Sequence, residues 1–151
     1  MKELQIVSFE QAERLKKLGF NWDVNTGWRI LPEERPETYP RFRRGFIRDT
    51  IMFNMNEDED TVSAPTTALA LKWMRYVKNV QNGITYFETI DGKKLHYYGR
   101  YQTADFLHRD TKVLDTHEEA ESALLDAILN DLDKLKQFGY EYSRRSSKRM
   151  V

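Results

Sequence analysis

The chain has 151 residues, with 24 Lys and Arg against 24 Asp and Glu, 40% hydrophobic residues and no cysteine. This length and apolar content suit one domain with a buried core, and the zero net charge argues against a protein that coats nucleic acid by bulk charge. Without cysteine the chain forms neither a disulfide nor a thiol-based site, which fits a reducing, cytoplasmic location. No apolar stretch has the length of a signal-peptide core or a membrane span, so we expect no membrane partner.

The first predicted element is a short amphipathic helix over residues 9–18. Ser8 and Gln11 have the spacing of a capping box, in which each side chain satisfies a backbone N–H of the other residue. Gly19 is well placed as the C-terminal stop, because glycine adopts the left-handed conformation that ends many helices.

The region that follows the first helix holds three of the four prolines, which limits regular structure to a short strand at residues 28–31. Residues 46–55 then alternate apolar and polar side chains, a pattern that predicts a half-buried strand. The apolar face of this strand would carry Ile47, Ile51, Phe53 and Met55.

A second helix is predicted over residues 65–79, where Pro65 is tolerated in the first turn. One stripe of this helix would carry Leu69, Trp73, Tyr76, Val77 and Val80. The next residues have the clearest short-range pattern in the chain: strands at 84–90 and 93–101 flank Asp91-Gly92, which is typical of a hairpin with a type I′ turn.

The hairpin register follows from this turn, and it places Phe87 opposite His96 and Tyr86 opposite Tyr97. The apolar face would carry Ile84, Tyr86, Ile90, Leu95 and Tyr97. The second face, mixed in character and open to solvent, would carry Thr85, Phe87, Thr89, Lys94, His96 and Tyr98.

A third strand is predicted at residues 112–114 and a third helix at 116–135, which begins at a second capping box, Thr116 with Glu119. We therefore expect an α+β fold, a single domain over residues 1–142 with an antiparallel sheet and about three helices packed on it. The strand at 47–55 would extend the same sheet, and the last helix would cover its apolar face. Residues 143–151 have the composition of a mobile basic tail.

Glycine spacing excludes the standard nucleotide and serine-hydrolase motifs. No two of the seven glycines are closer than seven residues, so a G-x-G-x-x-G loop, a P-loop and a G-x-S-x-G elbow are all impossible. The sequence predicts no catalytic residue, no metal site and no cofactor. An enzyme is the least favoured of three alternatives.

Only three histidines are available as bases at neutral pH. We expect His96 on the outer face of the sheet, His108 in a solvated loop and His117 in the first turn of the last helix. The carboxylates near them, such as Asp105 and Asp110, show no ordered spacing of metal ligands. A deep cleft that joins His96 with an acidic residue would instead favour an enzyme.

A basic and aromatic stretch is the sharper functional signal. Residues 35–48 carry a net charge of +4, with aromatic residues between the arginines. Pairing of these arginines with the acids at 57–60 or with the acidic last helix is the alternative. With the exposed face of the hairpin, this stretch makes up the predicted binding surface: Tyr39, Arg41, Phe42, Arg43, Arg44, Phe46, Phe87, His96 and Tyr98.

The order helix, hairpin, strand and helix over residues 65–135 is similar to that of the double-stranded-RNA-binding domain. That domain grips phosphates with a lysine cluster at the start of its last helix. This chain opens the same helix with Thr116-His117-Glu118-Glu119, which would repel phosphate. Only the topology is therefore shared.

Three blocks of sequence resemble a family of small uncharacterised bacterial and phage proteins. They run from Val7 to Phe20, from Ser63 to Arg75 with the start Ser63-Ala64-Pro65-Thr66, and from Thr116 to Ala120 with its two glutamates. The resemblance implies no activity and no site. It implies a cytoplasmic accessory protein of phage or mobile-element origin.

The leading hypothesis is a non-enzymatic interaction protein that binds a protein partner or a second copy of itself. The aromatic residues left over once the core is filled motivate it. The alternative is a nucleic-acid-binding protein that uses the basic and aromatic segment from Arg41 to Arg48, with salt-sensitive affinity.

Overall fold

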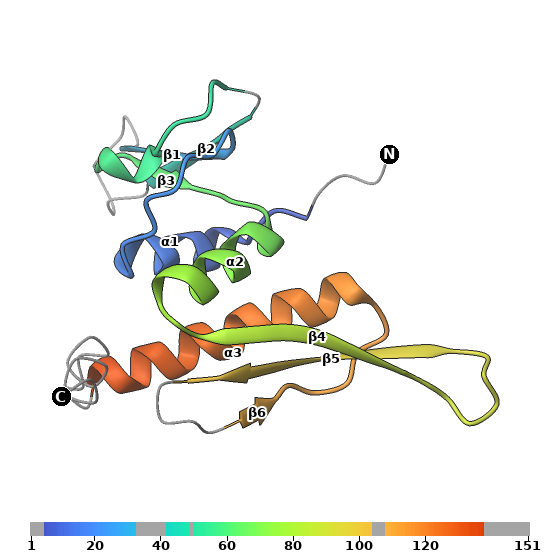
Figure 1. The fold of residues 1–151 in the computed structure, drawn as a ribbon. Coiled ribbons are helices and arrows are strands. Elements are labelled where there is room, and N and C mark those ends of the chain that lie inside the picture. The colour runs from blue at the N-terminus through green and yellow to red at the C-terminus, as the bar shows by residue number, and fades with distance from the viewer. Residues whose placement is uncertain (1–4, 33–41, 49, 104–107, 138–151) are drawn as a thin grey trace, which may run out of the picture. The chain divides into compact units, whose positions relative to one another are not determined.

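The first helix of the structure, α1 (Phe9–Lys17), begins at the predicted capping box (Figure 1). The Ser8 hydroxyl accepts the Gln11 backbone N–H at 3.1 Å, and the Gln11 side chain accepts the Ser8 N–H at 3.0 Å. After the helix Gly19 has a φ of 93°, the left-handed region that favours glycine. The predicted helix is therefore confirmed at both ends.

The chain divides into two compact units, residues 1–66 and 67–151. The computed structural model describes residues 5–32, 42–48, 50–103 and 108–137. These described residues form three α-helices and two three-stranded antiparallel sheets, so the predicted α+β class is confirmed. The prediction of one domain over residues 1–142 stays a prediction, and the tail at 143–151 lies outside the described residues.

The sheet of the first unit contains β1 (Gly27–Pro32), β2 (Phe42–Ile47) and β3 (Thr61–Ser63), in the order β2-β1-β3. The predicted strand at 28–31 is thus the centre of a sheet. Trp28 in β1 lies opposite Phe46 on one side and Val62 on the other. The expectation of one sheet for the whole chain is wrong, because β2 pairs with β1 and not with the hairpin.

The predicted strand at 46–55 is also wrong beyond Ile47. In the pairing of β2 with β1, Ile47 lies opposite Gly27, which is the first residue of β1, so the partner strand ends there. Ile51 and Phe53 are consequently exposed, whereas Met55 is buried in the 3-10 turn η1 (Met55–Glu57). Among the described residues, the pairing of this segment beyond Ile47 is reduced to an isolated bridge between Phe53 and Val24, which does not extend into a strand.

The acidic run at residues 57–60 is held by a cation from α1. The Lys16 ammonium donates to the backbone carbonyls of Asp58 and Thr61 at 2.7 Å and of Glu59 at 3.3 Å. Three carbonyl dipoles around one ammonium stabilise this turn next to β3.

The second unit has the order α2 (Thr67–Val77), β4 (Gln81–Glu88), β5 (Leu95–Gln102), β6 (His108–Asp110) and α3 (His117–Gln137). Its sheet has the order β4-β5-β6, and α3 packs across β5 and β4, as predicted for the last helix (Figure 1). The helix α2 contacts α3 and β4. Among the described residues, no helix is both long enough and apolar enough to cross a membrane.

The contact between α3 and β5 is close because Gly99 has no side chain. A Cβ atom at Gly99 would lie 2.8 Å from the Cβ of Leu124, so the helix lies directly on the strand at this point. The buried residues on the α3 face that makes this core are all apolar. They are Ala120, Leu124, Leu125, Ile128, Leu129 and Leu132.

The predicted register of the hairpin is confirmed, with Phe87 opposite His96 and Tyr86 opposite Tyr97. The type I′ turn is wrong, because of its two central residues only Gly92 has a positive φ, whereas a type I′ turn needs two. The strands end earlier than predicted. The last bonded pair before the turn is Thr89 with Lys94, in which the Thr89 N–H donates to the Lys94 carbonyl at 2.9 Å. Hydrogen bonds from the Thr89 hydroxyl and the Lys93 N–H to the Asp91 carboxylate hold the turn and lower the pKa of Asp91.

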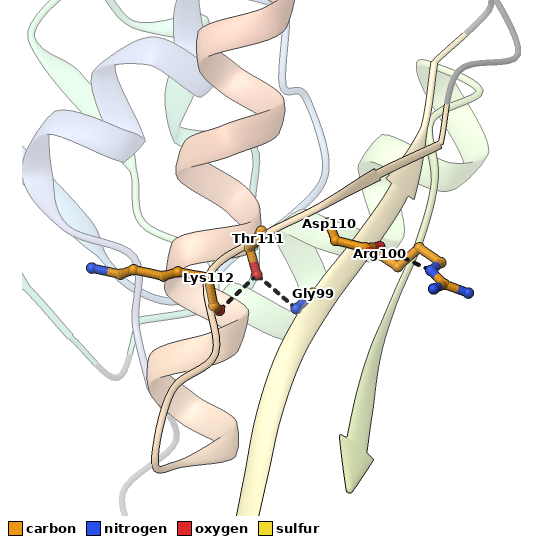
Figure 2. Close-up of polar contacts among 5 residues, drawn as sticks. All are labelled: Gly99, Arg100, Asp110, Thr111 and Lys112. Carbon is orange, nitrogen blue, oxygen red and sulfur yellow. Dashed lines mark hydrogen bonds and ion pairs between the residues drawn. The ribbon is translucent and has the colours of Figure 1, made fainter.

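The third strand of this sheet lies earlier than predicted. It is β6 at His108–Asp110, whereas Leu114 in the predicted segment makes an isolated bridge to Tyr97. Pairing continues one residue past β6, since the Thr111 N–H donates to the Gly99 carbonyl at 2.8 Å and the Thr111 hydroxyl accepts the Gly99 N–H at 2.7 Å (Figure 2). Further along, Leu114 returns to the same strand, because its N–H donates to the Tyr97 carbonyl at 2.7 Å and its carbonyl accepts the Tyr97 N–H at 2.8 Å.

A buried polar contact joins β5 to α3 at Tyr101. The Tyr101 hydroxyl donates to the Asp131 carboxylate at 2.6 Å, and Arg109 of β6 lies 3.3 Å from the same carboxylate oxygen. Burial raises the pKa of the Tyr101 phenol above its usual range, and the hydrogen bond to Asp131 adds to the shift.

We expect Tyr101→Phe to lower the free energy of unfolding at pH 7 by about 1.5–3 kcal/mol, because it removes a hydrogen bond to a charged acceptor. The raised pKa means that above pH 10 the unfolded chain ionises at this position before the folded protein does, so wild-type stability falls there. Urea unfolding between pH 7 and 11 should show this fall in wild type and a shallower one in Tyr101→Phe. Tyr76→Phe, at an exposed tyrosine, is the control and should match wild type.

Candidate functional site

We call the face of the β4-β5-β6 sheet that points away from α3 the outer face. It carries the aromatic, basic and acidic side chains that form the candidate site. Gly99 and Tyr101 contact α3, so by the alternation of a strand Tyr98 and Arg100 point the opposite way. The pairing of the strands then places on this face Gln81, Gly83, Thr85, Phe87, His96, Tyr98, Arg100, Gln102, His108 and Asp110.

Three residues predicted for binding meet on the outer face. The Phe87 ring lies 5.5 Å from the His96 ring and 6.3 Å from the Tyr98 ring, measured between centroids. Phe87 is 43% exposed in spite of these contacts. The structure therefore brings these three side chains together as an open aromatic cluster, and their role in binding stays a prediction.

The aromatic cluster adjoins the end of the hairpin, which extends past the first turn of α3 (Figure 1). We call residues 86–95 the hairpin tip. Because α3 does not cover it, the face predicted to be apolar core is open here, and Tyr86 is 66% exposed. Ile90 and Leu95 are exposed as well. Large apolar side chains thus lie open on both faces of the tip.

Two cations of the outer face are bound to carboxylates. The Arg100 guanidinium donates to Asp110 at 2.9 Å, a hydrogen bond that raises the pKa of Arg100 (Figure 2). Lys94 lies 3.1 Å from Asp115, and the His96 Nδ1 atom lies 3.6 Å from the same carboxylate oxygen. The charges on this face are therefore largely neutralised within the molecule.

The outer face is hollowed where β4 has a glycine. A hollow of about 270 Å³ lies between Gly83 and Thr85 on β4 and Arg100 and Gln102 on β5, with His108 at its rim. A Cβ atom at Gly83 would meet nothing within 4 Å. The hairpin pattern predicted the aromatic cluster but not this hollow, although a glycine inside a strand was the available signal.

The histidines lie on separate elements of the second unit. His96 lies on the outer face as predicted, His117 is the first residue of α3 and contacts Tyr97, and His108 begins β6 where a loop was expected. Asp115, which neighbours His96, has a side chain 63% exposed, so this pair lies at the surface. Among the described residues, no group of three or more His, Asp or Glu side chains could hold a metal ion.

The basic and aromatic stretch belongs to the first unit. Of the predicted residues, Tyr39 and Arg41 lie outside the described residues, and Phe42 and Arg43 are described only by their backbone in β2. Arg44 lies over the Phe9 ring, 4.3 Å from the guanidinium carbon to the centroid.

Phe46 is part of an aromatic group that sequence reasoning missed. Its ring lies 5.4 Å from that of Trp28, which in turn packs edge-on against Phe9 at 5.4 Å. Arg48 lies over the Phe46 ring at 5.1 Å. Within the described part of the chain, neither Arg44 nor Arg48 has a carboxylate partner within 4 Å, and the pairing of the basic stretch with acidic residues stays a prediction.

No family model, no curated protein and no solved structure matches this chain. The geometry of its own residues therefore carries the functional argument.

Proposed function

We propose that this protein is a non-enzymatic interaction protein and that the hairpin tip with its aromatic cluster is its contact surface for a protein. The observation that carries the proposal is the exposure of large apolar side chains on both faces of the tip. Such patches on a surface are typical of binding sites, and aromatic residues contribute most to binding energy at protein interfaces.

The charges of the outer face favour a protein partner over nucleic acid at this surface. Binding to nucleic acid depends on free cations of the protein, which displace the counterions condensed around the phosphates. Here Arg100 and Lys94 already neighbour Asp110 and Asp115. A mixed aromatic and polar partner surface fits such a face better than a polyanion does.

We expect Phe87→Ala and Tyr98→Ala each to weaken partner binding about tenfold or more, because each removes a ring from the centre of the surface. The test is quantitative affinity capture with the tagged chain, followed by light scattering of the purified protein at several concentrations. Tyr76→Ala removes an exposed ring from α2 and is the matched control. A strict monomer whose partners are retained equally by all variants would contradict the proposal.

A second candidate function rests on two arginines of the first unit. Arg44 and Arg48 lie over aromatic rings without carboxylate partners in the described structure, an arrangement suited to single-stranded nucleic acid. Arg44→Ala with Arg48→Ala should reduce the slope of log affinity against log salt by about 1–2. Gel retardation of single- and double-stranded DNA and RNA at low salt tests this, and absence of any retardation contradicts it.

A cytoplasmic location and kinship with small phage or mobile-element proteins belong to the same proposal. The cysteine-free composition supports the first. The block around Ser63-Ala64-Pro65-Thr66 supports the second. Neither one assigns a partner.

A further inference from the structure

The strand β4 is an edge of its sheet, and one side of its backbone is open. In an antiparallel pair, residues that bond to the neighbouring strand alternate with residues that point away. The bond from the Thr89 N–H to Lys94 sets this alternation, and Tyr97, opposite Tyr86, confirms it by bonding to Leu114 on the far side of β5. The N–H and C=O groups that point away from β5 are those of Asn82, Ile84, Tyr86 and Glu88.

This edge lacks the features that usually prevent strands from pairing with one another. Protective edges carry lysine, proline or a bulge. The eight residues of β4, Gln81–Glu88, contain no lysine, arginine or proline, and the ladder to β5 is continuous from Gln81 to Glu88. No described strand or loop pairs with the open side. A long unprotected edge of this kind is suited to pairing with another strand.

We propose that β4 pairs with β4 of a second copy of this chain, antiparallel about a twofold axis at Thr85, so that the two sheets become one of six strands. This inference rests on the proposed function and names its partner. The register follows from the open groups. With the axis at Thr85, Ile84 bonds to Tyr86 of the second copy and Asn82 bonds to its Glu88, so all four open residues are paired.

The outer face is complementary to itself in this register. Phe87 of one copy lies opposite Gly83 of the other copy. The hollow between β4 and β5 lies at this glycine, which has no side chain to obstruct the Phe87 ring. Aromatic residues that cover a glycine on the neighbouring strand stabilise sheets. Arg100 also borders the hollow, so its guanidinium, which is bound to Asp110, would lie beside the same ring. Each exposed Phe87 thus fills a hollow in the other copy.

The opposite face agrees in shape and in charge. Tyr86, which is exposed in a single chain, lies opposite Ile84 of the second copy, an apolar cross-strand pair. Glu88 lies opposite Asn82, and the Arg75 guanidinium donates to that Asn82 side chain at 2.8 Å. The single acid of the strand therefore approaches a cation, and no two like charges face each other.

Sedimentation velocity of the full chain over a range of concentrations tests the pairing. We expect wild type to form a dimer, and Thr85→Lys to raise the dimer dissociation constant at least about tenfold, because two ammonium groups then face each other on the axis. Thr85→Val is the matched control and should keep the dimer, since valine suits a strand and carries no charge. Thermal unfolding of each variant shows that the monomer fold is retained.

A cysteine at the axis tests the register directly, because the chain has no other cysteine. Thr85 and its copy form a non-hydrogen-bonded pair, in which the Cα atoms lie about 4.5 Å apart, within the range of about 4.4–6.8 Å for a disulfide. Thr85→Cys should therefore cross-link into a covalent dimer under mild oxidation, whereas Thr89→Cys, one residue past the end of β4, should not.

The outcomes separate this inference from the proposed function. A wild type that stays monomeric at all concentrations overturns the pairing, but leaves the proposed function supported if Tyr98→Ala still loses a captured protein. A dimer that is unaffected by Thr85→Lys and gives no cross-link through Thr85→Cys overturns the pairing at β4 and places self-association on another surface. A dimer that weakens with Thr85→Lys and cross-links only through Thr85→Cys supports it.

Discussion

Leu124→Asp is expected to unfold the second unit. Leu124 is fully buried on α3 and lies against Gly99 of β5, so the new carboxylate would enter a contact with no room for water. Burial of an unpaired charge costs several kcal/mol, about as much as the 5–15 kcal/mol that stabilise a typical domain. Far-UV circular dichroism with thermal or urea unfolding measures the loss.

The control for this variant is Asn130→Asp, which introduces the same carboxylate at an exposed position of the same helix. Its melting temperature should stay within a few degrees of wild type, because a surface substitution changes stability by about 0.5 kcal/mol or less. If Leu124→Asp also melts within a degree or two of wild type, the core does not lie between α3 and the sheet.

Local interactions explain which elements could be predicted from the sequence. The Ser8 and Gln11 capping box is confirmed by its two hydrogen bonds. Of the two bonds of the second box, the structure has the one in which the Thr116 hydroxyl accepts the Glu119 N–H, at 3.1 Å. The hairpin register is local too, since two strands joined by a short turn can pair in few ways. In each of these elements the interacting residues are close in sequence.

Non-local pairing explains the largest error. The alternation of residues 46–55 is compatible with a strand, but a strand also needs a partner, and the partner β1 ends at Gly27. The same alternation contained no information on which sheet the segment would join. Partner strands distant in sequence decide both questions.

The apolar stripe predicted for the second helix was partly wrong, because a stripe does not fix how the helix α2 is rotated about its axis. Trp73 and Val80 are buried as predicted, but Tyr76 and Val77 of the same stripe are exposed, whereas Ala70 and Met74 are buried. An apolar stripe shows that a helix has a buried side without fixing its rotation, because α2 has apolar residues around most of its surface.

The candidate site could be predicted in part for the same reasons. Phe87, His96 and Tyr98 were found because cross-strand neighbours follow from the hairpin register. The hollow at Gly83 was missed because the sequence does not show how deep a sheet face is. The aromatic group around Trp28 was missed because it depends on contacts between α1 and two strands that are distant in sequence. Sequence periodicity indicates which residues share a face of a strand or helix, but it does not indicate whether that face is flat or hollowed.

Gly27→Ala is expected to destabilise the sheet of the first unit by about 1–3 kcal/mol, the usual cost of overpacking. Gly27 lies in the central strand β1, and a Cβ atom there would lie 2.5 Å from the backbone oxygen of Val62 and would also meet the sulfur of Met55. A backbone atom of a paired strand cannot move aside as a flexible side chain can. The strands β1 and β3 must therefore separate locally. Because they pair over only three residues, this separation removes a large share of the hydrogen bonds between them.

Gly45→Ala is the matched control, because Gly45 lies in β2 of the same sheet and a Cβ atom there would meet nothing within 4 Å. It should leave stability unchanged or raise it by up to about 1 kcal/mol, since glycine in a strand loses more conformational freedom on folding than alanine. Hydrogen exchange over residues 5–66 measures both variants in this unit alone. Faster exchange in β1 and β3 is expected for Gly27→Ala only, and equal exchange in the two variants would contradict the close approach of β1 to β3.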